Sequence, residues 1–202
     1  MRFLLSSLLL ILCVSCTSYP KKQNFRLIET RSVSNLNPYF SDTTQDYIYK
    51  ANISAFDNNF GGIFIVKKLG PDHHRIVFTT ELGNKIFDFT FSKNEFKVNH
   101  VLKDLDKKLL INILQNDFKV LVTESPVVEK AFLRKTDTVY QTVILGKNHF
   151  HFSKKKQLYK IIRVKNGQPN VEFLFSEIND DLAKHIEINH QNLRLSIRLK
   201  SI

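Results

Sequence analysis

The sequence predicts a mainly β protein with helices, in which a large curved antiparallel sheet of about eleven strands forms an open half-barrel that a helical insertion closes. From residue 46 onward, apolar and polar residues alternate over most of the chain, as they do in half-buried strands. Short turn signals separate these runs, which favours antiparallel neighbours. One internal stretch, residues 104–122, instead spaces its leucines as a helix does. Because a sheet of this size tends to curl, we expect the helix to cover its concave face.

The N-terminal segment indicates export. Arg2 is followed by an apolar run that is too short for a comfortable transmembrane helix. The run ends in Val-Ser-Cys16, which resembles the lipobox of bacterial lipoproteins, in which signal peptidase cuts before the cysteine and the thiol carries diacylglycerol. We therefore expect residues 1–15 to be a lipoprotein signal peptide and residues 16–45 to hold the acylated Cys16 and a tether. The alternative is a plain cleaved signal that leaves Cys16 unmodified, as a lone thiol in an oxidising compartment.

The chain is strongly basic, with 30 Lys and Arg against 19 Asp and Glu, and only Arg2 of these lies in the signal segment. Basic proteins bind nucleic acid, anionic lipid surfaces or acidic ligands. For an exported protein, lipid phosphates are the more available partner, so we expect no nucleic acid. An ordinary solvated basic surface is the alternative.

The first strands follow directly from the alternation. A turn at 57–59 ends the first strand, in which Tyr49, Ala51, Ile53 and Ala55 share one face. Turns at 70–72, 82–84 and 92–94 then separate the next four. These four strands are expected at 60–69, 74–80, 86–91 and 96–101.

The helical insertion divides the strands into two groups. We expect a helix over 104–122 with Asp104 or Asp106 near its N-cap, a break at Ser125-Pro126, and a second short helix over 127–133. Strands then resume, and residues 46–202 form one domain. The strands of the second group are expected at 138–145, 149–153, 158–164, 171–178, 185–190 and 193–199.

A local similarity adds a functional expectation. Residues 74–89, a strand, the turn Leu82-Gly83 and a returning strand, resemble the corresponding hairpin of LolB-like outer-membrane lipoprotein receptors, in the Lol-type lipoprotein carrier family. This resemblance implies that Leu82 projects into solvent and, with Gly83, forms a membrane-insertion loop. The alternative is a turn leucine that folds back onto a neighbour.

The resemblance also implies a ligand. The chain has 17 Phe and no Trp, and many of the Phe lie in the alternating runs. A Phe-lined concavity would hold acyl chains without demanding one ligand shape, and each buried methylene contributes about 0.8 kcal/mol. The alternative for these residues is a dry packed core. The candidate cavity residues are Phe64, Val66, Phe78, Phe87, Phe89, Phe91 and Phe96.

The function expected from the resemblance is that of an outer-membrane-anchored lipoprotein, on the periplasmic face, that binds acyl chains and helps receive and insert lipoproteins. Its partners would be lipoprotein acyl chains, a soluble periplasmic lipoprotein carrier and outer-membrane lipid, and the protein would act as a monomer. No motif for an enzyme or for a cofactor is apparent in the sequence. The competing hypothesis is a structural or envelope-assembly lipoprotein with a packed sheet and protein partners.

Four histidines are candidate metal ligands. His149 and His151 share one strand face, and His185 or His190 would have to supply a third ligand. Since His149 and His151 alternate with Phe150 and Phe152, we expect them instead to form the polar outer face of a half-buried strand, with no metal site.

Overall fold

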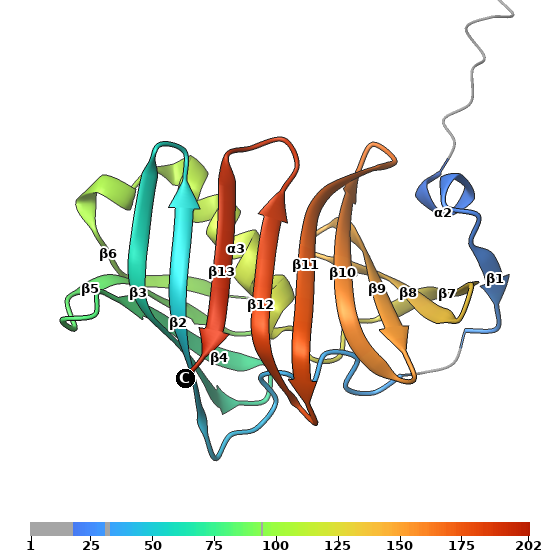
Figure 1. Cartoon of the computed structure of the whole chain (residues 1–202), viewed down its shortest axis with the longest axis horizontal. Coiled ribbons are helices and arrows are strands. Elements are labelled where there is room, and N and C mark those ends of the chain that lie inside the picture. Colours follow the sequence, from blue (N-terminus) through green and yellow to red (C-terminus); the bar gives the residue numbers. More distant parts are fainter. Residues whose placement is uncertain (1–17, 31–32, 94) are drawn as a thin grey trace, which may run out of the picture.

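The structure, a computed structural model, describes residues 18–202 apart from 31–32 and 94. Within these residues 13 strands form a single antiparallel sheet that does not close, and helix α3 lies against it (Figure 1). The predicted fold class is confirmed, with two strands more than the expected eleven or so. The signal segment 1–15 and Cys16 lie outside the described residues.

The strands follow the order β1-β7-β8-β9-β10-β11-β12-β13-β2-β3-β4-β5-β6. The two sequence groups are therefore joined through one pair, β13 with β2, in which Ile197 lies opposite Ile53. The strands are β1 (Arg26–Ile28), β2 (Asp46–Ala55), β3 (Asn58–Gly70), β4 (His73–Thr79), β5 (Lys85–Phe91), β6 (Phe96–Val101), β7 (Val128–Arg134), β8 (Asp137–Ile144), β9 (Lys147–Lys154), β10 (Gln157–Lys165), β11 (Gln168–Asn179), β12 (Leu182–His190) and β13 (Leu195–Ser201).

The pairing register places aromatic side chains in a row across four strands. Tyr49 lies opposite Phe64, Phe64 opposite Phe78, and Phe78 opposite Phe87. Since alternate residues of a strand point to the same face, this row continues along β5 through Phe89. The row lies on the concave side of the sheet and belongs to the larger of the two hydrophobic clusters.

The expected insertion helix is confirmed, although it begins later than predicted. Asp104 lies in the short 3₁₀ helix η1 (Lys103–Leu105), and α3 runs over Lys108–Val122 with Lys107 as its N-cap. Neither helix has a side-chain cap hydrogen bond at its start. The face of α3 toward the sheet carries Leu110, Leu114, Phe118 and Leu121, at the spacing of an amphipathic helix.

The prediction of a second short helix over 127–133 is wrong, because residues 128–133 belong to strand β7. A segment of seven residues is too short to be stable as a helix by itself. In the sheet its backbone pairs on both sides, with Ala131 opposite Tyr140 of β8 and opposite Ile28 of β1. Tertiary pairing therefore decides the conformation.

The expected tether contains ordered elements. Strand β1 is the edge strand beside β7 (Figure 1). Helix α2 (Tyr19–Lys22) packs on the face of the sheet opposite α3, where Tyr19 joins a second hydrophobic cluster. The other buried members of this cluster are Phe132, Val139, Phe150, Phe152 and Ile162. No helix of the described residues is both long and apolar enough to cross a membrane.

Candidate functional site

The seven residues proposed to line a cavity lie together on one face of the sheet. Six of the seven candidate residues are at most 1% exposed, and Phe96 is partly buried at the edge of the same cluster. Across the face, the ring centroid of Phe118 in α3 lies 5.3 Å from that of Phe64 and 5.6 Å from that of Phe87. The six are Phe64, Val66, Phe78, Phe87, Phe89 and Phe91.

Little space remains beneath the helix. A cavity of about 10 Å³ lies where Phe78 and Phe87 meet Leu110 and Leu114. Such a volume is at the lower limit for a single water molecule. In this conformation, helix α3 therefore occupies the concave face as a packed core.

A larger space opens between the β5–β6 turn, α3 and the turn after β8, and we name it the seam pocket. Its volume is about 250 Å³. Phe91 and Phe96 line it from the β5–β6 end, Leu145 from the turn after β8, and Gln115 and Lys119 from α3. The pocket thus combines apolar walls with a cation, as the site of an amphipathic ligand would.

Lys119 ties α3 to the β5–β6 end of this pocket. Its Nζ donates a hydrogen bond to the carbonyl oxygen of Ser92 at 2.8 Å. Burial lowers the pKa of the Lys119 ammonium group. Lys93 and Glu95 also line the pocket, so its rim carries both signs of charge.

A buried polar cluster joins the middle of α3 to the opposite half of the sheet. Arg163 Nη1 donates to Asp117 Oδ1 at 2.9 Å, and His190 Nε2 lies 2.7 Å from Asp117 Oδ2. Arg163 also donates through Nη2 to the carbonyl oxygen of Asn116 at 2.9 Å and through Nε to His149 Nε2 at 3.2 Å. These contacts neutralise the Asp117 carboxylate and fix the helix over β10 and β12.

The placement predicted for His149 and His151 is wrong. Both side chains are buried on the concave side, whereas the alternating Phe150 and Phe152 belong to the convex cluster under α2. Burial, reinforced by the Arg163 cation, lowers the pKa of His149 to about 3, and burial alone lowers that of His151 to about 3. Among the described residues, no three His, Cys, Asp or Glu side chains are placed to hold a metal ion.

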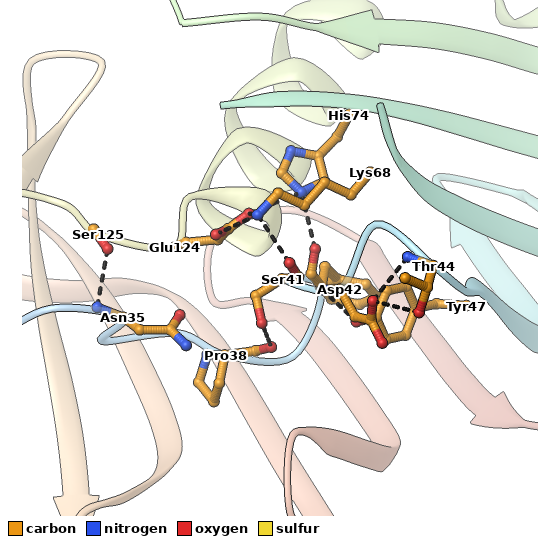
Figure 2. Close-up of polar contacts among 11 residues, drawn as sticks. Asn35, Pro38, Ser41, Asp42, Thr44, Tyr47, Lys68, His74, Glu124 and Ser125 are labelled. Carbon is orange, nitrogen blue, oxygen red and sulfur yellow. Dashed lines mark hydrogen bonds and ion pairs between the residues drawn. The ribbon is translucent and has the colours of Figure 1, made fainter. Parts of the chain in front are cut away.

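The C-terminal end of α3 is held by a segment that sequence reasoning assigned to the tether (Figure 2). Asn37 donates from its backbone to the carbonyl oxygen of Glu124 at 2.9 Å and from Nδ2 to that of Leu121 at 2.8 Å. Lys68 Nζ donates to Glu124 Oε2 at 2.9 Å and to the carbonyl oxygen of Ser41 at 2.8 Å. The helix end and this segment therefore share one polar network.

The same segment also fills the end of the concave face. Tyr39 and Phe40 are at most 1% exposed, and the Tyr39 ring centroid lies 4.8 Å from that of Phe175. The Tyr39 hydroxyl donates to the carbonyl oxygen of Leu158. The adjacent aromatic pair was the available sequence signal that this stretch is not a free tether.

The turn between β4 and β5 exposes Leu82. Its side chain is 91% exposed, and Gly83 has φ +85°, a conformation that favours glycine. The turn is closed by backbone hydrogen bonds from Gly83 N to Thr80 O at 2.9 Å and from Thr80 N to Asn84 O at 2.8 Å. The leucine therefore does not fold back onto a neighbour.

The hairpin that carries this turn is braced by a buried carboxylate. Asp88 accepts hydrogen bonds from Arg75 Nε and Nη2 at 2.9 and 2.6 Å and from Lys85 Nζ at 3.0 Å. The Arg75 hydrogen bonds hold the pKa of Asp88 well below its usual range. Leu82 is thus presented on a rigid stem.

Two further leucines are exposed at this end of the hairpin. Leu102 donates from its backbone to Ile86 O at 2.8 Å, just after the turn, and its side chain is 40% exposed. Leu109, in the first turn of α3, is 63% exposed. Three leucines therefore face solvent near the start of α3.

Comparisons with known proteins give structural likeness without sequence similarity. No protein-family model matches the sequence, and no curated protein is significantly similar to it. A LolA superfamily protein from Nitrosomonas europaea is 8% identical, with a TM-score of 0.48 over 85% of this chain and 92% of that chain. A Vibrio parahaemolyticus domain named for outer membrane lipoprotein sorting is 7% identical, with a TM-score of 0.44 over 77% and 83%. A DUF1329 family protein from Desulfovibrio piger is 12% identical, with a TM-score of 0.41 over 80% and 85%.

Proposed function

We propose that this chain is an envelope lipoprotein, anchored through Cys16 in the periplasmic leaflet of the outer membrane, that binds acyl chains on its concave face. In this role it would receive lipoproteins from a soluble carrier and help to insert them into the membrane. The observation that carries the proposal is an open sheet whose Phe-rich concave face is covered mainly by the amphipathic helix α3.

Uptake of an acyl chain requires α3 to move, and its contacts indicate which part moves. In the described part of the chain, the hydrogen bonds and ion pairs between α3 and the sheet begin at residue 116, whereas residues 108–115 meet it through apolar contacts. Since an acyl chain can replace apolar contacts at little cost, we expect the N-terminal half of α3 to lift. The buried polar cluster would stay paired and act as the pivot.

Leu82 has the role of entering the bilayer in this proposal. Its side chain stands clear of the protein on a braced hairpin, at the end where the lifted helix would open the concave face. Leu102 and Leu109 also expose apolar side chains. Insertion of these leucines would bring the opening to the acyl region of the receiving leaflet.

The test replaces Leu82 by glutamate. A charge on a 91% exposed side chain leaves folding intact but is costly to bury in lipid. We expect Leu82→Glu to stop the transfer of a lipoprotein from a soluble carrier into membranes, whereas Leu69→Glu, at an exposed leucine of β3, transfers normally. Normal transfer by Leu82→Glu would refute the role of this residue.

A second candidate function is favoured by the tight packing under α3. With a cavity of only about 10 Å³ beneath the helix, the sheet is also suited to a structural or assembly lipoprotein that binds protein partners. Binding of a fluorescent fatty acid to residues 17–202 separates the two functions. Saturable binding supports lipid handling, and no binding supports the assembly role.

A further inference from the structure

A groove outside the concave face lies at the N-terminal end of the described chain, and we name it the N-terminal groove. Its volume is about 470 Å³, and it lies on the convex side of the sheet between α2, β1 and strands β7–β10. Its apolar walls are Tyr19, Phe25, Leu27, Phe132, Phe150 and Val164. It shares no lining residue with the seam pocket, so it is a separate site.

Aromatic contacts fix the position of this groove relative to the N-terminus. The Tyr19 ring centroid lies 4.7 Å from that of Phe150 and 5.7 Å from that of Phe25. Phe25 in turn lies 5.7 Å from Phe132. Helix α2 is therefore held on the sheet by its side chains, and its first residues form one wall of the groove.

The groove retains apolar surface that the fold does not cover. Leu27 lines it and is 63% exposed, although its strand is paired with β7. Two cations, Lys21 of α2 and Lys130 of β7, also line it. Apolar walls with ammonium groups beside them suit a hydrocarbon chain whose polar end lies at a lipid surface.

The chain itself brings such a ligand to this place. Ser18 lines the groove, and Cys16 precedes it by two residues, which span at most about 7 Å. We propose that the N-terminal groove holds one acyl chain of the lipid on Cys16. This inference rests on the acylation of Cys16 in the proposed function.

With the groove occupied, the lipid on Cys16 would be held in two places at once, the groove and the bilayer. One acyl chain would lie along Phe25, Leu27 and Phe150, while the others stay in the bilayer. Lys21 and Lys130 would meet headgroup phosphates of the same leaflet. The convex side around α2 would thereby be held against the membrane.

Photocrosslinking of the full, processed chain tests this assignment. Benzoylphenylalanine replaces Leu27 in the groove or, as a matched control, Leu193, a leucine that is 40% exposed in the connection between β12 and β13. The protein is placed in vesicles of phosphatidylethanolamine and phosphatidylglycerol with deuterated acyl chains, irradiated, and analysed by mass spectrometry. We expect the residue 27 peptide to join the undeuterated acyl group of the Cys16 peptide at least ten times as often as the residue 193 peptide does.

Each other outcome is distinguishable. Crosslinks from position 27 to deuterated vesicle lipid, or none at all, would overturn the groove assignment while leaving acylation intact. An unmodified Cys16 peptide in the spectrum before irradiation would refute the acylation itself, and with it the anchor in the proposed function. A second probe at Lys130, an exposed position on the groove, repeats the measurement if Leu27→benzoylphenylalanine does not fold.

Discussion

The Asp117 carboxylate links helix α3 to two strands far from it in sequence. It is fully buried, with Arg163 and His190 as its charged and hydrogen-bonding neighbours. A buried ion pair is weak evidence for net stability, but removal of one partner leaves the other charge buried without compensation. Asp117 therefore keeps Arg163 paired and holds this part of α3 against β10 and β12.

We expect Asp117→Asn to lower the free energy of unfolding by about 3–5 kcal/mol, because Arg163 then stays buried without its counter-ion. Asp57→Asn is the matched control, since Asp57 pairs with Arg194 at 2.9 Å but both side chains are more than three-quarters exposed. That exposed pair should contribute at most about 1 kcal/mol. Equal effects of the two substitutions in urea denaturation would contradict this account of the cluster.

The two faces of strand β9 could be predicted from the sequence only in part. The alternation of His149 and His151 with Phe150 and Phe152 correctly placed the two pairs on opposite faces. It could not tell which face is concave, because α2 covers the outer face at this point and makes both sides of β9 buried. By contrast, the exposed position of Leu82 was expected from the resemblance to the LolB-like hairpin, because the local sequence is equally compatible with a turn leucine folded onto a neighbour.

Strand β3 approaches β4 closely at Gly62. A Cβ built on Gly62 would lie 1.9 Å from the carbonyl oxygen of Thr79, at the end of the strand that precedes the Leu82 turn. A Cβ built on the neighbouring Gly61 would have no heavy atom within 4 Å. One of the two glycines therefore shapes the hairpin, and the other does not.

Gly62→Ala should force the backbones of β3 and β4 apart, and we expect it to lower the free energy of unfolding by about 1–3 kcal/mol. Gly61→Ala adds the same methyl group without a clash and should change stability by less than about 0.5 kcal/mol. Thermal or urea denaturation of both variants provides the measurement. Similar stabilities would show that the sheet accommodates the methyl group and that this close approach is not structurally required.

Long elements were predictable and short ones were not. The periodicity of 104–122 identified α3, and the alternation from residue 46 identified β2 to β6, because both patterns extend over several turns or strand pairs. Helix α2 and strand β1 have four and three residues, too few for a period to appear. Strand β7 has a partner on each side, and pairing of this kind is invisible in the local sequence.

The burial of three histidines makes the stability of the whole fold depend on pH. One of them, His74, lies in β4, and the other two, His149 and His151, lie in β9. Burial is the main cause that lowers the pKa of each of these side chains. In the unfolded chain the pKa of each of these histidines is about 6.5. The unfolded state therefore binds more protons below this pH, and stability falls as the pH decreases.

We expect the free energy of unfolding to fall as the pH decreases from about 6.5 to 4.5, by about 1 kcal/mol per pH unit for each histidine that stays neutral in the folded state. Above about pH 7, where both states are neutral at these positions, the dependence should vanish. Urea titrations between pH 4.5 and 7.5 measure it. The double variant His151→Leu/Thr142→Val, which removes one histidine with its hydrogen-bond partner at 3.0 Å, should flatten the slope, and an unchanged slope would exclude His151 as a cause.

The docked helix α2 limits how the molecule can approach a bilayer. Because Tyr19 is packed into the convex cluster, only about two residues separate Cys16 from the folded body. With an acylated Cys16, the domain would have one preferred orientation on the leaflet, unlike a domain joined to its anchor by a long flexible linker. Turning the Leu82 hairpin toward the same leaflet would then require either a pose in which both surfaces touch the lipid together, or release of the Tyr19 ring from Phe150 and Phe25. In the proposed function, the strength of the contacts of Tyr19 with Phe150 and Phe25 would limit how far the domain can move from its anchor.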